Sequence, residues 1–200
     1  MMTWLTHPEK AVERLAFSPH ISFFKRPVSN TVPFKDITLI EVYSYLKSDY
    51  AKEQTERLRA ITDKSLASRF KAENFDYVTF GGTFTTRRNT DIKFPSDLLC
   101  LDFDHVPNVP MYREMLLRDR EFPTALLFTS PSGNGIKWVI PIRTDTHLYE
   151  EAFRAVSNYI QSTYGLQPDQ KCKDIARACF LPHDPEAYIN PKYVPPYAER

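Results

Sequence analysis

An apolar run that ends in two acids lies near the middle of the chain: Leu98-Leu99-Cys100-Leu101-Asp102-Phe103-Asp104. Side chains alternate between the faces of a strand, so the run predicts a buried strand with Asp102 and Asp104 on one face, about 7 Å apart along the backbone. The alternate apolar side chains, beginning with Leu99, then point into the core. Neighbouring carboxylates repel each other unless a cation lies between them. The run therefore predicts either a site for a hard divalent cation or two solvated acids at the start of a turn.

Two apolar segments downstream, 125–129 and 136–142, are predicted to be strands joined as a hairpin. They flank the loop Ser130-Pro131-Ser132-Gly133-Asn134-Gly135. Its small hydroxyls and two glycines leave backbone N–H groups accessible, which favours anion binding. The loop lacks the spacing of a P-loop, and a strand rather than a helix follows it. Lys137, at the mouth of the hairpin, is predicted to meet a phosphate; the alternative is a plain turn with a solvated lysine.

Two acids and an arginine near the C-terminus form a third group, in which Asp169 and Asp174 precede Arg177. The planar guanidinium of Arg177 suits a carboxylate or a phosphate. Taken alone, this group more often indicates a structural ion pair.

A basic set follows the turn at 81–82 and precedes the acidic strand: Arg87, Arg88 and Lys93. It predicts either a solvated surface or a contact with the phosphates of a template strand. Four of the five glycines of the chain lie at 81–82 and within 133–135. Because glycine allows another group to approach the backbone closely, these two places are expected to make such contacts.

The remaining segments predict a mixture of helices and strands. Strands are expected at 21–25 and 77–80. A capping box, Thr38-x-x-Glu41, predicts the start of a helix that runs to about residue 58. The other expected elements are helices at 65–73 and 111–120, a helix from 148 that Gly165 could end, and a strand at 174–181. This order predicts an α/β (α+β) fold.

The composition is that of an ordinary globular protein: 200 residues, 42% of them hydrophobic and 26% charged. A net charge of +1 does not by itself indicate a polyanionic partner, so nucleic-acid binding would depend on local patches. Cys100, Cys172 and Cys179 are widely spaced, which excludes a disulfide framework or a Cys-rich zinc site and favours the cytoplasm. No apolar stretch approaches a membrane span, and the first residues lack the pattern of a signal peptide.

Together the three groups resemble the archaeo-eukaryotic primase superfamily, in its primase-polymerase branch. The motifs of that family are a strand ending in Asp-x-Asp, a Ser-x-Gly-x-Gly-x-His-like segment and a later Asp that precedes an Arg. They match 101–104, 130–137 and the pair Asp169 and Arg177. Phe80-Gly81-Gly82-Thr83-Phe84 and the segment 176–185 are similar to one subgroup, the N-terminal domain of virulence-associated E-like proteins of Bacteroides and its mobile elements.

The resemblance implies a primase-polymerase-like fold with a largely antiparallel, RNA-recognition-like sheet and flanking helices. It implies a metal-dependent nucleotidyltransferase that acts in the replication of DNA or of a mobile element. Mg²⁺ or Mn²⁺ would be held by the catalytic acids Asp102, Asp104 and Asp169, with Asp174 as the alternative third acid. The expected nucleotide-binding residues are Ser130, Ser132, Gly133, Gly135, Lys137 and Arg177, and the expected nucleic-acid-binding residues are Arg87, Arg88 and Lys93.

The expected partners are a single-stranded DNA template, nucleoside triphosphates and a helicase-type ATPase domain or protein, in the cytoplasm and without a membrane. The chain would divide into an N-terminal extension (1–20), a primase-polymerase-like domain (21–190) and a linker or tail (191–200). Asp102→Ala is expected to abolish activity and leave the fold intact. Lys137 stands where the family usually has histidine, which keeps open a non-catalytic nucleic-acid-binding module on a decayed primase fold.

A phosphatase of the haloacid dehalogenase type is the other enzyme alternative. Asp102-Phe103-Asp104-His105-Val106 fits its first motif, with Asp102 as a covalent nucleophile and Asp104 as the acid/base. Against it, about 100 residues precede the acidic strand, which normally begins that fold, and the expected late strand ending in paired acids is missing. This alternative predicts a parallel, doubly wound sheet with Asp102 on a central strand.

Overall fold

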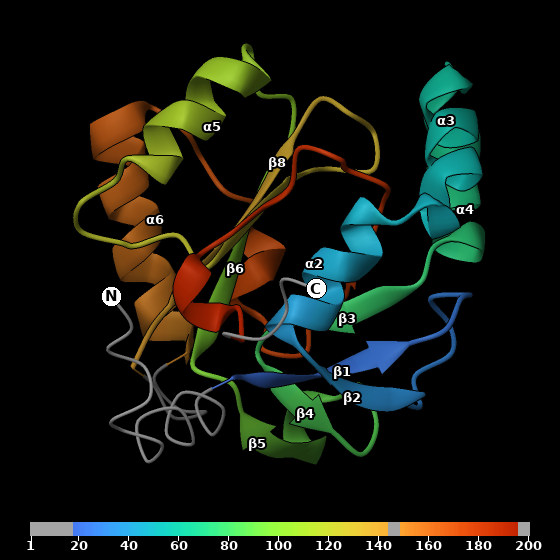
Figure 1. Ribbon diagram of the computed structural model, residues 1–200, viewed down its shortest axis with the longest axis horizontal. Helices are drawn as coiled ribbons and strands as arrows, with labels where there is room; N and C mark the ends of the chain where they lie inside the picture. The colour runs from blue at the N-terminus through green and yellow to red at the C-terminus, as the bar shows by residue number, and fades with distance from the viewer. Residues whose placement is uncertain (1–17, 144–148, 196–200) are drawn as a thin grey trace, which may run out of the picture.

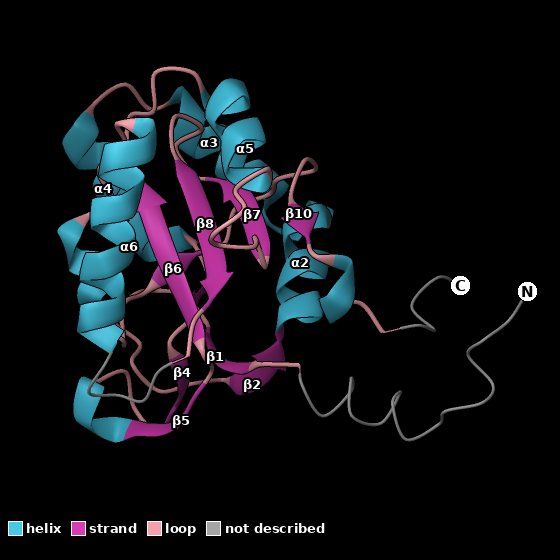
Figure 2. Ribbon diagram, turned by 90° about the vertical axis from the view of Figure 1, so that its left-hand side faces the viewer, coloured by secondary structure: helices cyan, strands magenta, loops and turns pink. Residues whose placement is uncertain are grey.

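The computed structural model describes residues 18–143 and 149–195, which form an α+β fold with two four-stranded sheets (Figures 1 and 2). The predicted N-terminal extension and the end of the predicted tail lie largely outside these residues. Every strand pair that the structure describes is antiparallel, which confirms the expected class of sheet. None of the helices within the described ranges is long and apolar enough to cross a membrane.

The first sheet carries the acidic strand. Its strands are β6 (Leu98–Phe103), β7 (Leu126–Thr129), β8 (Ile136–Pro141) and β10 (Tyr188–Ile189), in the order β10-β7-β8-β6. Figure 2 shows β6, β8 and β7 side by side. The predicted hairpin is confirmed as β7 and β8, and β8 also pairs with β6. This nonlocal pairing places Asp102 directly opposite Lys137.

The second sheet packs near the acidic strand through its last member. Its strands are β1 (His20–Phe24), β2 (Lys35–Thr38), β3 (Tyr77–Thr79) and β9 (Cys179–Phe180), in the order β2-β1-β3-β9. A separate hairpin pairs β4 (Gly82–Phe84) with β5 (Ile92–Pro95). The Cys179 Sγ lies 4.0 Å from that of Cys100 on β6, so the two sheets meet beside Asp102.

Helices cover the first sheet on both faces. The longer ones are α2 (Leu39–Lys47), α3 (Lys52–Ala60), α4 (Lys64–Asn74), α5 (Val109–Leu117) and α6 (Tyr149–Tyr164). In Figure 1, α5 and α6 lie to the left of β6 and β8, and α2 lies to the right. The α5 and α6 side packs against Leu99, Leu101 and Trp138, which confirms the predicted direction of the apolar side chains. Leu98 and Val139 face α2, so Asp102 and Lys137 lie on that same face.

Two predicted elements differ from those observed. The helix expected from 39 to about 58 is divided after α2, because Ser48 is extended and its hydroxyl accepts a hydrogen bond from the Tyr50 N–H at the start of a 3₁₀ turn, Asp49–Ala51. The strand expected at 174–181 is reduced to β9. Asp174 accepts a hydrogen bond from the Ala176 N–H, and such local bonding favours turns over strands.

Candidate functional site

A buried ion pair forms the centre of the candidate site. Asp102 and Lys137 are only 8% and 9% exposed, and the Lys137 ammonium donates directly to the Asp102 Oδ2. Burial acts to lower the pKa of Lys137, but the Asp102 carboxylate outweighs it and raises that pKa above the ordinary value. The raised pKa favours the protonated form of Lys137, which is directed toward Asp102 within the fold.

Asp169 reaches the same place from a different part of the chain. It caps the 3₁₀ helix η3 (Gln170–Lys173), where its carboxylate accepts a hydrogen bond from the Lys171 N–H. Its backbone N–H donates to the Asp102 carbonyl oxygen at 2.8 Å, which joins η3 to the end of β6. Its other carboxylate oxygen lies 3.0 Å from the guanidinium of Arg177.

Three potential metal ligands come together at this contact. One carboxylate oxygen each of Asp102 and Asp169 and the Cys172 Sγ all lie within 4.8 Å of one another. The Asp102 Oδ1 is buried and has no hydrogen-bond partner within the described part of the chain. Because buried carboxylate oxygens are normally satisfied, an unpartnered oxygen on a residue of this ligand group fits a divalent cation.

The other two candidate acids lie apart from that group. Asp104 follows the end of β6 and is exposed; burial raises the pKa of Asp102, and the charge of Asp104 acts in the same direction. Asp174 is also exposed and caps a turn through the Ala176 N–H. Of the two candidates for the third acid, the structure thus brings Asp169, and not Asp174, into the ligand group with Asp102.

The loop between β7 and β8 closes tightly on the end of β6. A Cβ added at Gly135 would lie 2.5 Å from the Phe103 carbonyl oxygen, so only glycine permits this approach. The Ser130 and Gly133 N–H groups donate to carbonyls within the loop at 2.9 Å, which leaves fewer N–H groups for an anion than expected. Ser130 is buried and Ser132 is exposed.

The family comparison covers both ion pairs, the ligand group and the loop of this site. The family described as BT4734-like, N-terminal domain matches residues 69–189. The chain belongs to this family. No curated protein and no solved structure matches it. The matched range of this BT4734-like domain runs from α4 to β10, and so includes both ion pairs and the loop.

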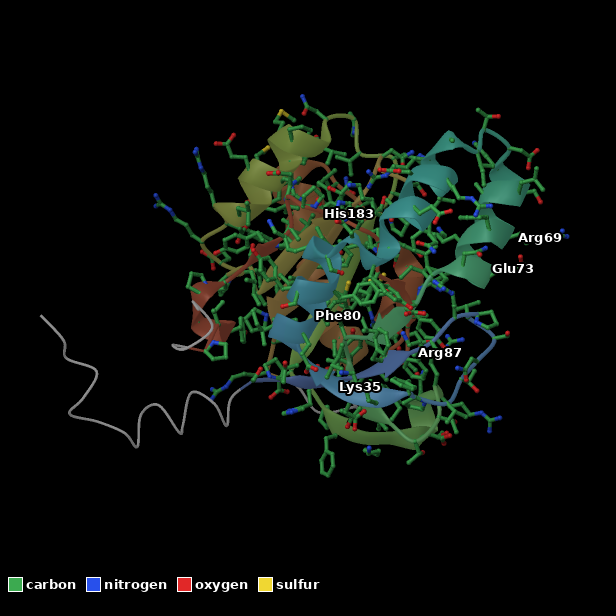
Figure 3. All side chains as sticks on the ribbon, turned by 45° about the vertical axis from the view of Figure 1, so that its right-hand side comes forward. Lys35, Arg69, Glu73, Phe80, Arg87 and His183 are labelled. Carbon is green, nitrogen blue, oxygen red and sulfur yellow. The ribbon has the colours of Figure 1, made fainter. Side chains whose placement is uncertain are left out.

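The basic set of this BT4734-like domain is engaged in the second sheet and the small hairpin. The Arg87 guanidinium lies 5.3 Å from the Tyr77 ring centroid and donates to the Tyr77 hydroxyl. Lys93 pairs with Asp36 at 2.9 Å, whereas Arg88 is exposed at the start of a 3₁₀ turn, Asn89–Asp91. In Figure 3, Arg87 lies toward the lower end of the molecule, below Phe80. The structure therefore does not bring the basic set into the ligand group.

Sequence reasoning missed two residues at the site. Cys172 follows Asp169 by three positions, and residues i and i+3 lie on the same side of a 3₁₀ turn, so an Asp-x-x-Cys spacing could have indicated it. The Arg59 Nε donates to the Pro131 carbonyl oxygen at 3.2 Å and adds a cation beside the loop. Nothing in the local sequence of α3 indicates that contact, because it depends on how the helix packs.

Proposed function

We propose that this chain is a metal-dependent nucleotidyltransferase domain of the primase-polymerase type. The observation that carries the proposal is the meeting of Asp102 and Asp169, which come from a strand and a distant 3₁₀ turn. Carboxylates from separate segments are needed to hold the metal ions that assist phosphoryl transfer. The resemblance of 101–104, 130–137 and Asp169 with Arg177 to the primase motifs supports the same activity.

The Asp102 Oδ1 and the Asp169 carboxylate would hold the cation, Mg²⁺ or Mn²⁺, with Asp104 near the outer surface. When bound, such an ion supplies charge neutralisation for a triphosphate and acidifies an attacking hydroxyl. Arg177, with 41% of its side chain exposed, is free to present its planar guanidinium to phosphate oxygens. Lys137 orients Asp102 through the buried ion pair, and Ser132 lies on the exposed rim of the loop.

The charge balance limits how tightly a cation binds. Lys137 and Arg177 already offset the two carboxylates of Asp102 and Asp169. A triphosphate adds negative charge beside Arg177, so metal and nucleotide are expected to bind together more tightly than either binds alone. A template strand would then lie along Arg88 and neighbouring basic residues. A role in replication of DNA or of a mobile element, with a helicase-type partner in the cytoplasm, rests on the resemblance alone.

The pairing of β6 does not favour the phosphatase alternative. The phosphatase alternative predicts Asp102 on a central strand of a parallel sheet. In the structure, β6 lies at the edge of its sheet and pairs antiparallel with β8. In the phosphatase alternative Asp102 would be the nucleophile, but its carboxylate is already paired with the buried Lys137 ammonium.

One observation favours a second candidate, a non-catalytic nucleic-acid-binding module. The Lys137 ammonium already occupies the Asp102 Oδ2, and the cavity beside the pair has a volume of about 20 Å³, which is room for about one water molecule. In that case the internal ammonium takes the place of a metal ion and no nucleotidyl transfer occurs.

Primer extension with matched variants separates the two candidates. Wild type, Asp169→Asn and Asp174→Asn are incubated with a primed single-stranded DNA template, nucleoside triphosphates and Mn²⁺ or Mg²⁺. We expect extension by wild type and Asp174→Asn and a loss of about 100-fold or more in Asp169→Asn, since a ligand of the catalytic ion is removed. Asparagine still accepts the Lys171 N–H, so the 3₁₀ turn is retained. The absence of extension and of metal-dependent nucleotide binding in wild type would favour the non-catalytic module.

A further inference from the structure

We propose that Cys172 is the third protein ligand of this site, which therefore binds a thiophilic divalent cation of the Zn²⁺ class through Asp102, Asp169 and Cys172. The inference rests on the proposed metal site, adds a third protein ligand to it and ranks a thiophilic cation above Mg²⁺. Three protein ligands leave a fourth position for water or a substrate oxygen, as catalytic zinc sites do. Mg²⁺, by contrast, prefers oxygen ligands throughout.

The placement of Cys172 is the first argument. Its Sγ shares the 4.8 Å group with the two carboxylate oxygens, and the residue is 3% exposed. Its backbone N–H donates to the Asp169 carbonyl oxygen at 2.9 Å, so the turn that positions Asp169 also fixes the cysteine. Both residues therefore present their ligand atoms to Asp102 from one short rigid element.

The unpartnered oxygen of Asp102 is an independent argument. The Asp102 side chain is 12% exposed, and Lys137 contacts only its Oδ2. The Oδ1 is left buried without a hydrogen bond from the described residues, which is costly unless another group binds it. A cation held by Asp102, Asp169 and Cys172 would supply that partner.

The charges around the site explain why a thiolate is needed. Lys137 and Arg177 offset the two aspartates, so the carboxylates alone give the site little net negative charge. Binding breaks the Cys172 S–H bond, forms a sulfur–metal bond and releases the proton to solvent. The thiolate thus gives the site the net negative charge that Lys137 and Arg177 otherwise neutralise.

The other two cysteines provide matched controls. Cys100 and Cys179 line the cavity beside Asp102 and Lys137, and their sulfur atoms lie 4.0 Å apart. Neither belongs to the ligand group found among the described residues. The substitution Cys179→Ser therefore changes a buried thiol near the site without removing a proposed ligand.

Titration of the full-length chain with Co²⁺ tests the proposal, because a cobalt–thiolate bond gives a charge-transfer absorption band in the near ultraviolet. We expect the band in wild type and Cys179→Ser. Cys172→Ser should lose it and bind Co²⁺ more weakly, because one of the three protein ligands is removed. Zn²⁺ should displace Co²⁺, and an excess of Mg²⁺ should not. Circular dichroism checks that both variants fold, and Cys172→Ala serves as a second variant where serine fails to fold.

The outcomes distinguish this inference from the proposed function. Binding of Co²⁺ with equal affinity in wild type and Cys172→Ser, without a thiolate band, would overturn the role of Cys172 and leave an all-oxygen metal site intact. A band that disappears in Cys179→Ser but persists in Cys172→Ser would also overturn it. If wild type binds neither Co²⁺ nor Mn²⁺, with or without a nucleoside triphosphate, the proposed function fails together with the inference.

Discussion

Two ion pairs lie side by side at the end of β6, and they differ in burial. Asp102 and Lys137 have side chains 12% and 11% exposed and face each other across β6 and β8. Asp169 and Arg177 are 23% and 41% exposed and lie on a 3₁₀ turn and the segment that follows it. One pair is part of the sheet, and the other is at the surface.

This difference in burial separates a pair that stays fixed in the fold from a pair whose partner a ligand can replace. A buried pair cannot lose one partner without leaving a charge in a region of low polarity, so it is fixed. An exposed pair contributes little to stability and can be replaced by a ligand at small cost. We therefore propose that Lys137 and Asp102 fix the geometry of the site, and that Arg177 would contact an incoming phosphate.

The largest expected effect is on stability. Asp102→Ala leaves the Lys137 ammonium buried without its partner, which should lower the free energy of unfolding by about 3–5 kcal/mol. The structure thus contradicts the expectation that this substitution spares the fold, because Asp102 is buried and paired rather than solvated. Urea denaturation measures the loss.

The double variant Asp102→Leu/Lys137→Met is the control for that experiment. It replaces both charges with apolar groups of similar size and should recover most of the lost stability, since such replacements are often neutral. A single variant as stable as wild type would show that the pair is solvated, and would contradict its assignment to the fixed interior of the site.

An intermediate effect on stability is expected from ionisation of the Cys172 thiol, which lies next to the buried pair. In the metal-free chain, kept so with a chelator, burial raises the pKa of this thiol to about 12, above the value of about 8.5 for a free cysteine. The unfolded chain therefore loses this proton at a lower pH than the folded chain. The protonated thiol should contribute fully to the free energy of unfolding below pH about 8.5. Its contribution to that free energy should fall by about 1.4 kcal/mol per pH unit between about 8.5 and 12.

The pH dependence is measured as the difference in unfolding free energy between wild type and Cys172→Ser, which cancels the titration of other groups. We expect this difference to shrink as the pH rises. A difference that stays constant across the range would show that the Cys172 thiol is not held in a buried environment.

The smallest effect on stability is expected at the exposed pair. Arg177→Gln should change the free energy of unfolding by less than about 1 kcal/mol, because solvent and salt screen the pair. The same substitution should weaken nucleotide binding, since the guanidinium is the more exposed cation of the two pairs. Thermal denaturation and nucleotide titration of one sample test both statements, and a large loss of stability would remove the distinction between the two pairs.

The sequence predicted the local elements well and the contacts between distant segments poorly. The alternation in 98–103 and the loop at 130–135 are local signals, and the strand and hairpin follow from them. The direct pairing of Asp102 with Lys137 depends on the register of β6 against β8, which no local pattern contains. Lys137 therefore appeared to be a surface phosphate contact, although it is buried.

The C-terminal segment shows a second reason. Asp169 and Asp174 both accept hydrogen bonds from nearby backbone N–H groups, and these turns bring Cys172 inward instead of forming one long strand. The periodicity of hydrophobic residues does not report such capping. The only local sign that Cys172 lies beside Asp169 was the spacing of three residues between them.

The most direct test of the metal-dependent site is calorimetric titration of wild type and Asp169→Asn with a non-hydrolysable nucleoside triphosphate, with and without Mn²⁺. The convergence of Asp102 and Asp169 predicts binding that requires Mn²⁺ in wild type and is lost in Asp169→Asn; Asp174→Asn, titrated beside them as the control, should bind like wild type. Equal binding by wild type and Asp169→Asn, or binding that does not depend on Mn²⁺, would contradict a metal-dependent nucleotide site at the end of β6.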